Sequence, residues 1–269
     1  MDLSLKGELK RIFNEKGLRP SKKLGQHFLI SKAPVFKLIE AANLNENDAV
    51  VEVGSGTGVI TEEILKKGVK SLIAVEKDGR LAEILKQKLN GFDNLEILRE
   101  DALKMKEPQG RYKVLGNIPY YLTVPLIRKF LNSKNKPELM VLMIQKEVGE
   151  RICAKPPKTN FLAVLIQFSS FPKIMMKVKK DSFFPTPKVD SVILRIILKK
   201  ETEELDYNLF LKVLRAGFSS PRKQILNNLR GLNLQKQEIE SLLQRLNINP
   251  KLRAEDLRLE DWVQIAKML

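Results

Sequence analysis

The chain has 269 residues, which is enough for one large domain or for a medium domain and a small one. Its single cysteine and single histidine exclude an internal disulfide bond and a Cys/His metal cluster, and no metal is expected. Lysine and arginine number 48 against 32 for aspartate and glutamate, and this net charge of +16 favours a polyanionic partner, above all nucleic acid.

The sequence carries no sign of a membrane segment or of a signal peptide. It contains no run of about 18 uncharged apolar residues. Residues 1–25 mix acidic side chains with lysines and lack the apolar core of a signal peptide. We therefore expect a cytoplasmic protein that does not associate with membranes. Residues 201–269 hold 11 basic and 10 acidic side chains, so the basic excess lies in the first two-thirds of the chain.

Residues 1–31 form a basic leader, whose proline and glycines rule out one continuous helix. A helix is predicted to begin after it, at Ser31 or Lys32, because Pro34 suits a first helical turn. Apolar residues then recur at helical spacing as far as Ala42.

A strand, a glycine-rich loop and a helix are predicted next. Residues 49–53 are a short β-rich run that ends in Gly54-Ser55-Gly56-Thr57-Gly58, and a helical pattern follows. Such a loop lets the backbone pass close to a ligand at the carboxyl end of a parallel sheet. Its spacing differs from the dinucleotide fingerprint G-x-G-x-x-G. We expect it to bind a nucleotide-like cofactor.

Two further strands end in carboxylates. The strand at 71–75 ends in Glu76-Lys77-Asp78, and an acidic residue about 20 positions after the glycine loop can bind a ribose hydroxyl pair. The strand at 94–98 leads to Asp101-Ala102, and Asp101 could accept a hydrogen bond from an adenine amino group. Taken alone, each carboxylate could equally be a solvated loop residue or a helix cap.

A fourth strand, at 112–115, delivers Asn117-Ile118-Pro119-Tyr120 to the same edge of the sheet. The amide, the proline and the aromatic ring suit a flat substrate that forms hydrogen bonds. The same residues could be only a turn followed by a helix start. Because four strand ends converge on one crevice, we favour a binding site.

The rest of the chain is predicted to form further strands and helices and then to become wholly helical. Beyond a charged linker at 199–204, we predict a small helical domain with Trp262 in its core. The predicted domains are therefore 1–200, which includes the leader, and 201–269. The other predicted elements are strands at 139–144, 173–178 and 192–198, helices at 146–152 and 160–168, and a loop at 183–191.

These motifs resemble those of class I S-adenosylmethionine-dependent methyltransferases. The segment Glu52-Val53-Gly54-Ser55-Gly56-Thr57-Gly58 matches their E-x-G-x-G-x-G cofactor loop, and Asn117-Ile118-Pro119-Tyr120 matches the motif of amino-group methylases. Together with Leu24-Gly25-Gln26-His27-Phe28-Leu29 and the segment from Phe183 to Ser191, they resemble the rRNA adenine N6,N6-dimethyltransferases. The likeness is to the small-subunit branch and covers nearly the whole chain.

The resemblance implies a fold, a cofactor and a set of contacts. The fold is a Rossmann-like α/β domain with a seven-stranded, mostly parallel sheet whose last strand is antiparallel, followed by a small all-α domain that binds RNA. The family usually has Asn where this chain has His27, and a backbone contact at His27 or Leu29 tolerates that change. The implied contacts with S-adenosylmethionine are His27, Leu29, Gly54, Gly56, Glu76, Lys77, Asp101, Ala102 and Asn117.

The resemblance also implies an activity. The family transfers methyl groups from S-adenosylmethionine to N6 of two adjacent adenosines in the 3′-terminal hairpin loop of 16S rRNA during ribosome biogenesis. The implied partner is small-subunit rRNA in an immature 30S particle, and the enzyme is expected to be a monomer. Candidate phosphate contacts are Lys22, Lys23, Arg222 and Lys223.

The implied catalytic residues are Asn117, Pro119, Tyr120 and Phe183. The Asn117 side-chain oxygen, with the carbonyl of Ile118 or Pro119, would accept both N–H bonds of the adenine amino group. Tyr120 offers a stacking face, and Phe183 would form the opposite wall. Alternatively, Phe183 only anchors a rigid loop beside two prolines.

Three other functions remain open. The first is a large-subunit rRNA adenine N6-methyltransferase of the antibiotic-resistance type, which shares the cofactor loop. The second is a non-catalytic rRNA-binding assembly factor that keeps the fold. A nicotinamide-dependent dehydrogenase is disfavoured, because the sequence lacks its fingerprint after the first strand.

Overall fold

A computed structural model describes residues 4–199 and 205–269. The chain divides into two compact units. The first comprises the described residues up to Gly149 together with Lys173–Leu198, and the second comprises Glu150–Pro172 and the described residues from Lys199 onward. Among these residues, no helix is both long enough and apolar enough to cross a membrane.

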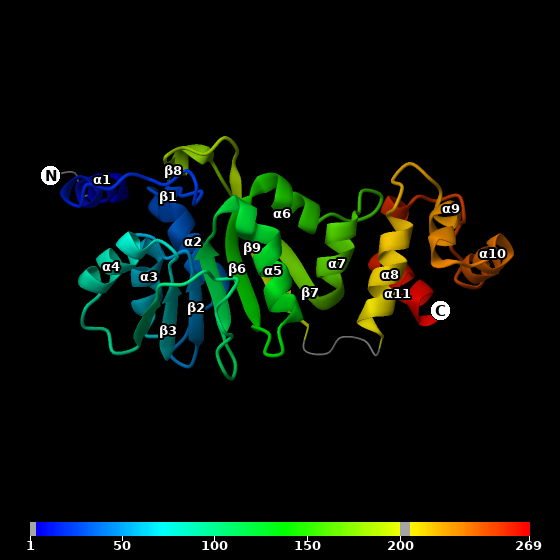
Figure 1. The fold of residues 1–269 in the computed structure, drawn as a ribbon, viewed down its shortest axis with the longest axis horizontal. Coiled ribbons are helices and arrows are strands. Elements are labelled where there is room, and N and C mark those ends of the chain that lie inside the picture. Colours follow the sequence, from blue (N-terminus) through cyan, green and yellow to red (C-terminus); the bar gives the residue numbers. More distant parts are fainter. Residues whose placement is uncertain (1–3, 200–204) are drawn as a thin grey trace. The chain divides into compact units, whose positions relative to one another are not determined.

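A seven-stranded sheet has the order β4-β3-β2-β5-β6-β9-β7, shown in Figure 1. The neighbouring pairs among β4, β3, β2, β5 and β6 are parallel, and β9 runs antiparallel to β6. This is the predicted mostly parallel sheet whose last strand is antiparallel. The strands are β2 (Ala49–Val53), β3 (Ser71–Val75), β4 (Leu95–Leu98), β5 (Lys113–Asn117), β6 (Leu139–Gln145), β7 (Ser170–Val178) and β9 (Ser191–Leu198).

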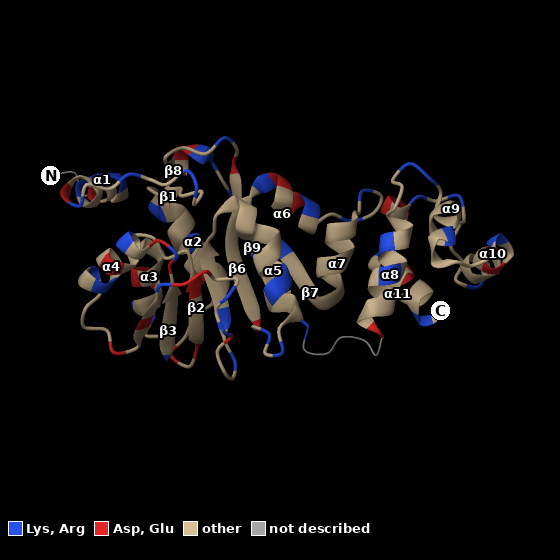
Figure 2. Cartoon of the chain, viewed as in Figure 1, with Lys and Arg blue, Asp and Glu red and all other residues tan. Residues whose placement is uncertain are grey.

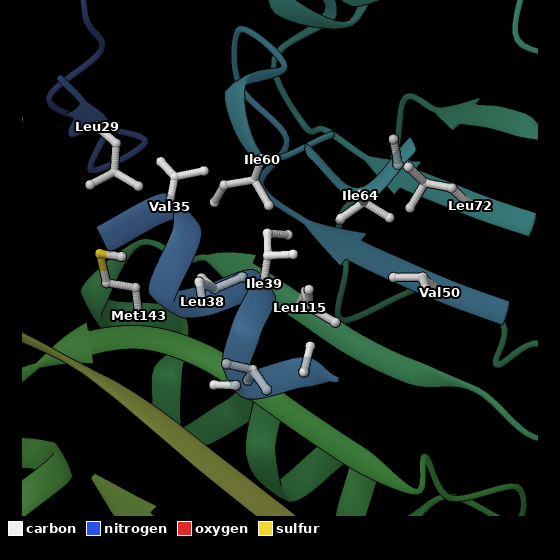
Figure 3. Packing of buried hydrophobic residues seen from close by; sticks show 14 of the residues in the cluster. Leu29, Val35, Leu38, Ile39, Val50, Ile60, Ile64, Leu72, Leu115 and Met143 are labelled. Carbon is white, nitrogen blue, oxygen red and sulfur yellow. The ribbon is translucent and has the colours of Figure 1, made fainter. Parts of the chain in front are cut away.

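Helices cover both faces of the sheet, which explains why β6 is apolar at six consecutive buried positions. On one face, α2 (Lys32–Ala42), α3 (Val59–Leu65) and α4 (Gly79–Lys88) share a core with alternate residues of the strands. Figure 3 shows Leu38 and Ile39 of α2 among Val50, Leu115 and Met143 of the sheet. Figure 1 shows α5 (Thr123–Asn132) in front of the sheet, with Leu126, Ile127 and Phe130 buried.

The leader begins with the helix α1 (Leu5–Glu15), which is capped by the Ser4 hydroxyl. It continues as turns and ends in the short strand β1 (Phe28–Leu29). β1 pairs antiparallel with β8 (Phe183–Phe184), a strand within the segment that the sequence predicts to be a loop. The loop prediction is wrong at these two residues, because their pairing partner lies more than 150 positions earlier in the chain.

The second unit is helical. Its core contains Trp262, which is fully buried as predicted, and Phe168, whose ring stacks on that of Phe210 at 4.1 Å between centroids. Since Phe168 belongs to α7, this helix groups with the helical unit and not with the predicted domain 1–200. The predicted boundary itself lies outside the described residues. The helices are α7 (Phe161–Ser169), α8 (Tyr207–Gly217), α9 (Ile225–Leu229), α10 (Lys236–Arg245) and α11 (Leu259–Lys267).

Short helical elements complete the fold. They are α6 (Lys146–Ile152) and the 3-10 turns η1 (Tyr120–Leu122), η2 (Lys180–Ser182), η3 (Arg230–Leu232) and η4 (Ala254–Asp256).

Candidate active site

The carboxyl ends of four parallel strands meet at one edge of the sheet. Val53 of β2 pairs with Val75 of β3, which in turn pairs with Leu98 of β4, and Glu52 pairs with Leu115 of β5. The residues that follow these strands surround one cavity in the first unit. Every predicted site residue lines it: His27, Leu29, Gly54, Gly56, Glu76, Lys77, Asp101, Ala102, Asn117, Pro119, Tyr120 and Phe183.

The glycine loop brings bare backbone to the floor of this cavity. Gly54 has φ +76°, a conformation that side chains strongly disfavour. A Cβ atom at this position would also lie 3.1 Å from the Asn117 carbonyl oxygen, and one at Gly56 would lie 3.4 Å from the Phe28 ring. Glycine at these two positions therefore leaves the backbone of the loop without side chains where it lines the cavity.

The Glu76 carboxylate is held by the backbone. Its Oε2 accepts a hydrogen bond from Gly56 N at 2.9 Å, and its Oε1 accepts one from Asp78 N at 2.8 Å. Burial raises the pKa of Glu76, and the two N–H donors oppose that rise. The result is a carboxylate that lines the cavity and is fixed there by two backbone hydrogen bonds.

Glu52 lies beneath the loop and does not line the cavity. It is fully buried, and the Thr61 hydroxyl donates to its Oε2 at 2.6 Å. Its Oε1 has no hydrogen-bond partner among the described residues. Burial raises the pKa of Glu52 to about 7. Figure 2 shows acidic residues gathered around this end of β2, in a chain otherwise rich in lysine and arginine.

The opposite rim is formed by the loop after β4. Asp101 pairs with Lys77 at 2.7 Å, and this ion pair lowers the pKa of Asp101. The Lys129 ammonium group of α5 donates to the carbonyls of Ala102 and Met105 and so holds the loop in place. Sequence reasoning missed Lys129, because nothing in its helical spacing points to a loop more than 20 residues earlier.

The other side of the cavity is built from side chains of three segments. Asn117 Nδ2 donates to the His27 carbonyl at 2.9 Å. His27 Nδ1 donates to the Pro185 carbonyl at 2.6 Å, and the His27 ring lies nearly parallel to that of Tyr120, with centroids 5.9 Å apart. The Tyr120 hydroxyl forms a 2.9 Å hydrogen bond with Ser191 Oγ. The leader, the end of β5 with the turn that follows it, and the β8–β9 segment are thus connected.

Phe183 lines the cavity but is only 2% exposed and belongs to the core of the first unit. Phe184 packs against a separate cluster around Phe13 and Phe28. Little of the Phe183 ring is accessible for stacking in this structure, so its role as a wall for a base stays a prediction.

Gln26 is a second residue that sequence reasoning did not single out. Its Oε1 accepts from Ser21 N at 2.7 Å, and its Nε2 donates to Asp78 Oδ2 at 3.0 Å. Arg80 and Gln26 together lower the pKa of Asp78 to about 2. Gln26 therefore connects the leader to the turn that follows Glu76. The sequence feature that could have pointed to Gln26 is the motif Leu24–Leu29, which contains it.

The candidate phosphate contacts do not line the cavity. Lys22 and Lys23 lie in the first unit, and Arg222 and Lys223 lie in the second. Within residues 4–199 and 205–269, no three His, Cys, Asp or Glu side chains are grouped so that they could hold a metal ion.

Comparison with known proteins gives a consistent result. The family model of ribosomal RNA adenine dimethylase matches residues 17–269. A protein named ribosomal RNA small subunit methyltransferase A from Dehalococcoides mccartyi is 41% identical, with 97% of this chain and 92% of the relative covered. A protein of the same name from Clostridium botulinum is 36% identical, with 96% of each chain covered.

Solved structures agree in fold. A dimethyladenosine transferase from Plasmodium falciparum has a TM-score of 0.78 at 29% identity, with 88% of this chain and 95% of that one covered. The 23S rRNA methyltransferase ErmE has a TM-score of 0.77 at 24% identity, covering 90% and 99%, which bears on the fold alone. The match over residues 17–269 and the identity to these relatives place the chain in the ribosomal RNA adenine dimethylase family.

Proposed function

We propose that the protein is an S-adenosylmethionine-dependent methyltransferase that dimethylates N6 of adenosines in small-subunit rRNA. More narrowly, we propose as its substrate two adjacent adenosines of the 3′-terminal hairpin loop, in an immature 30S particle in the cytoplasm, and that it acts as a monomer. The family, the names of the relatives and the net charge of +16 support this proposal.

The described residues fit the cofactor. The bare backbone of Gly54 and Gly56 leaves space beside the strand ends. Glu76 offers fixed carboxylate oxygens to ribose hydroxyls, and Asp101 offers an acceptor to the adenine amino group at the rim. Once bound, S-adenosylmethionine supplies a methyl group activated by its positively charged sulfur.

The observation that carries the proposal is the orientation of the Asn117 amide. Its Nδ2 is used by the His27 carbonyl, so its Oδ1 is left to accept a hydrogen bond, and no described residue donates to it. An acceptor at this place suits the amino group of adenine, whose nitrogen is a poor nucleophile because its lone pair is delocalised into the ring. Acceptors on both N–H bonds favour a more pyramidal nitrogen.

The second acceptor is better assigned to Ile118 than to Pro119. The Pro119 carbonyl accepts a hydrogen bond from Leu122 N at 2.9 Å in the turn η1, whereas the Ile118 carbonyl has no such donor among the described residues. Tyr120 offers its ring to the base. Burial raises the pKa of Tyr120, so its hydroxyl stays protonated near neutral pH and does not act as a base. Positioning and electrostatics then supply most of the acceleration.

The test is methylation of 30S particles from a strain that lacks this modification, followed by mass spectrometry of the digested rRNA. We expect N6,N6-dimethyladenosine in the 3′-terminal hairpin with the wild-type protein, and a fall of at least about 100-fold in rate with Asn117→Ala. The matched control is Asn94→Ala, since Asn94 also donates its amide to a backbone carbonyl, that of Val69 at 2.7 Å, but does not line the cavity.

Three results would contradict the proposal. Methylation of 23S rRNA in place of 16S rRNA would point to the antibiotic-resistance type of enzyme. Tight binding to 30S particles without any methyl transfer would point to an assembly factor. Full activity of Asn117→Ala would refute the assigned role of its amide.

A further inference from the structure

Tyr121 is an exposed aromatic residue at the mouth of the cavity. It lines the same cavity as Asn117 and Tyr120, yet 57% of its surface is exposed. The other three tyrosines are held: Tyr112 and Tyr120 by hydrogen bonds from their hydroxyls, and Tyr207 by ring contact with Phe168. Among the described residues, no side-chain hydrogen bond and no aromatic partner is formed by Tyr121.

The leader supports the Tyr121 ring from one side. A Cβ atom at Gly25 would lie 3.5 Å from Tyr121 Cε1 and 3.6 Å from Cδ1, so the ring rests against the backbone of a residue without a side chain. Gly25 also has φ +62°, which favours glycine at this turn. The ring is therefore positioned by the protein while much of its surface remains open to solvent.

The chemistry around Tyr121 suits RNA. Lys77 lines the same cavity as Tyr121, and its ammonium group, which pairs with Asp101 at 2.7 Å, brings a cation to this cavity. Aromatic side chains next to cations are the usual platform for bases of single-stranded nucleic acids, because every base has a face on which to stack. An exposed tyrosine without such surroundings would be an ordinary solvated residue.

We infer that Tyr121 is a stacking platform for the nucleobase that neighbours the target adenosine in single-stranded RNA. Tyr120 and Tyr121 are consecutive, so their Cα atoms are about 3.8 Å apart, and a base on Tyr121 must be close along the RNA chain to the base at Tyr120. The inference rests on the proposed function and deepens it, since it adds a subsite for a second nucleotide.

The experiment uses the hairpin of the small-subunit rRNA 3′ end, with 2-aminopurine in place of a nucleotide on either side of the target adenosine. Stacking quenches 2-aminopurine fluorescence. We expect quenching at one of these positions with wild type and with Tyr121→Phe, and loss of at least about half of it with Tyr121→Ala. With 30S particles that lack the modification as substrate, Tyr121→Ala should raise the KM about fivefold to tenfold, with kcat within about twofold.

Two controls separate this role from others. Phe92→Ala removes another exposed aromatic side chain, one that does not line the cavity, and should change neither quenching nor KM. Calorimetric titration with S-adenosylmethionine alone should give Tyr121→Ala the wild-type affinity within about twofold. A matching loss of cofactor affinity would show that Tyr121 covers the cofactor and would overturn the inference.

The remaining outcomes are also decisive. If wild type methylates the rRNA while Tyr121→Ala keeps both its quenching and its KM, the stacking platform alone is refuted. If wild type transfers no methyl group to the rRNA, the proposed function fails, and the inference fails with it.

Discussion

The two sides of the cavity are held in different ways. On the side proposed for the cofactor, backbone atoms and strand ends set the geometry, as in the hydrogen bonds from Gly56 N and Asp78 N to Glu76. On the side proposed for the base, side chains connect three segments distant in sequence, as in the contacts of His27 with Asn117 and Pro185. A change on the first side should therefore act on the whole site, whereas one on the second should act locally.

The largest expected effect is that of Gly54→Ala. The new methyl group would lie 3.1 Å from the Asn117 carbonyl oxygen and would displace Asn117. The alanine backbone would also have to adopt a left-handed conformation, which strains the loop. Since a displacement of about 1 Å can cost about 100-fold in rate, we expect methyl transfer to fall by about 100-fold or more. The measurement is the initial rate on 30S particles at saturating S-adenosylmethionine.

Gly68→Ala is its matched control. Gly68 has φ +64° but no atom within 4 Å of its would-be Cβ, so it carries the backbone strain without the collision. We expect each variant to lose at least about 1–2 kcal/mol of unfolding free energy from the backbone strain, and only Gly54→Ala to lose activity. Equal activity of the two variants would show that the contact between Gly54 and Asn117 does not matter.

The difference between the backbone-held cofactor side and the side-chain-held substrate side explains how much of each could be predicted from the sequence. The cofactor side could be read from sequence because parallel strands place their carboxyl ends at one edge, so Glu76 and Asp101 were found from strand pattern and spacing alone. The Asn-Ile-Pro-Tyr segment was also predicted to belong to a binding site, from its residue types and its place after a strand, although by itself it is also an ordinary turn. Only its assignment to an adenine amino group came from resemblance.

The side-chain connections were not predictable. The hydrogen bond between Gln26 and Asp78 spans 52 positions, and that between His27 and Pro185 spans 158. Neither hydrogen bond can be predicted from a repeating pattern of residues, because both depend on where the leader is placed by the pairing of β1 with β8. The unit to which α7 belongs was not predictable either. Its apolar residues are compatible with a helix packed on the sheet, but they lie in the core of the helical unit.

The second effect in size concerns Glu52, the buried carboxylate under the glycine loop. Its pKa is about 7 in the folded protein, above the ordinary value of 4.5. Between pH 4.5 and about pH 7, Glu52 therefore keeps its proton in the folded state but has lost it in the unfolded state. The stability from this group is fully present below pH 4.5 and is lost as the pH rises through about 7, by at most about 3 kcal/mol.

The variant Glu52→Gln removes this titration and should flatten the dependence of unfolding free energy on pH between about 5 and 8. Urea unfolding across this range, compared with wild type, measures the difference. The variant Glu96→Gln, which removes an exposed negative charge on β4, controls for the change in net charge. A curve for Glu52→Gln that stays parallel to wild type would show that Glu52 is already ionised in the folded protein at low pH.

The smallest effect is expected on the substrate side, from Tyr120→Phe. The variant keeps the ring for stacking and loses only the 2.9 Å hydrogen bond to Ser191 Oγ. A hydrogen bond of this kind contributes about 0.5–1.5 kcal/mol, so kcat/KM should fall about twofold to tenfold, with no change in affinity for S-adenosylmethionine. Ser191→Ala removes the same bond from the other side. Because both changes break the same hydrogen bond, the double variant should be no less active than the less active of the two single variants. Additive losses would mean that the two side chains act separately and that the substrate side is less connected than its contacts indicate.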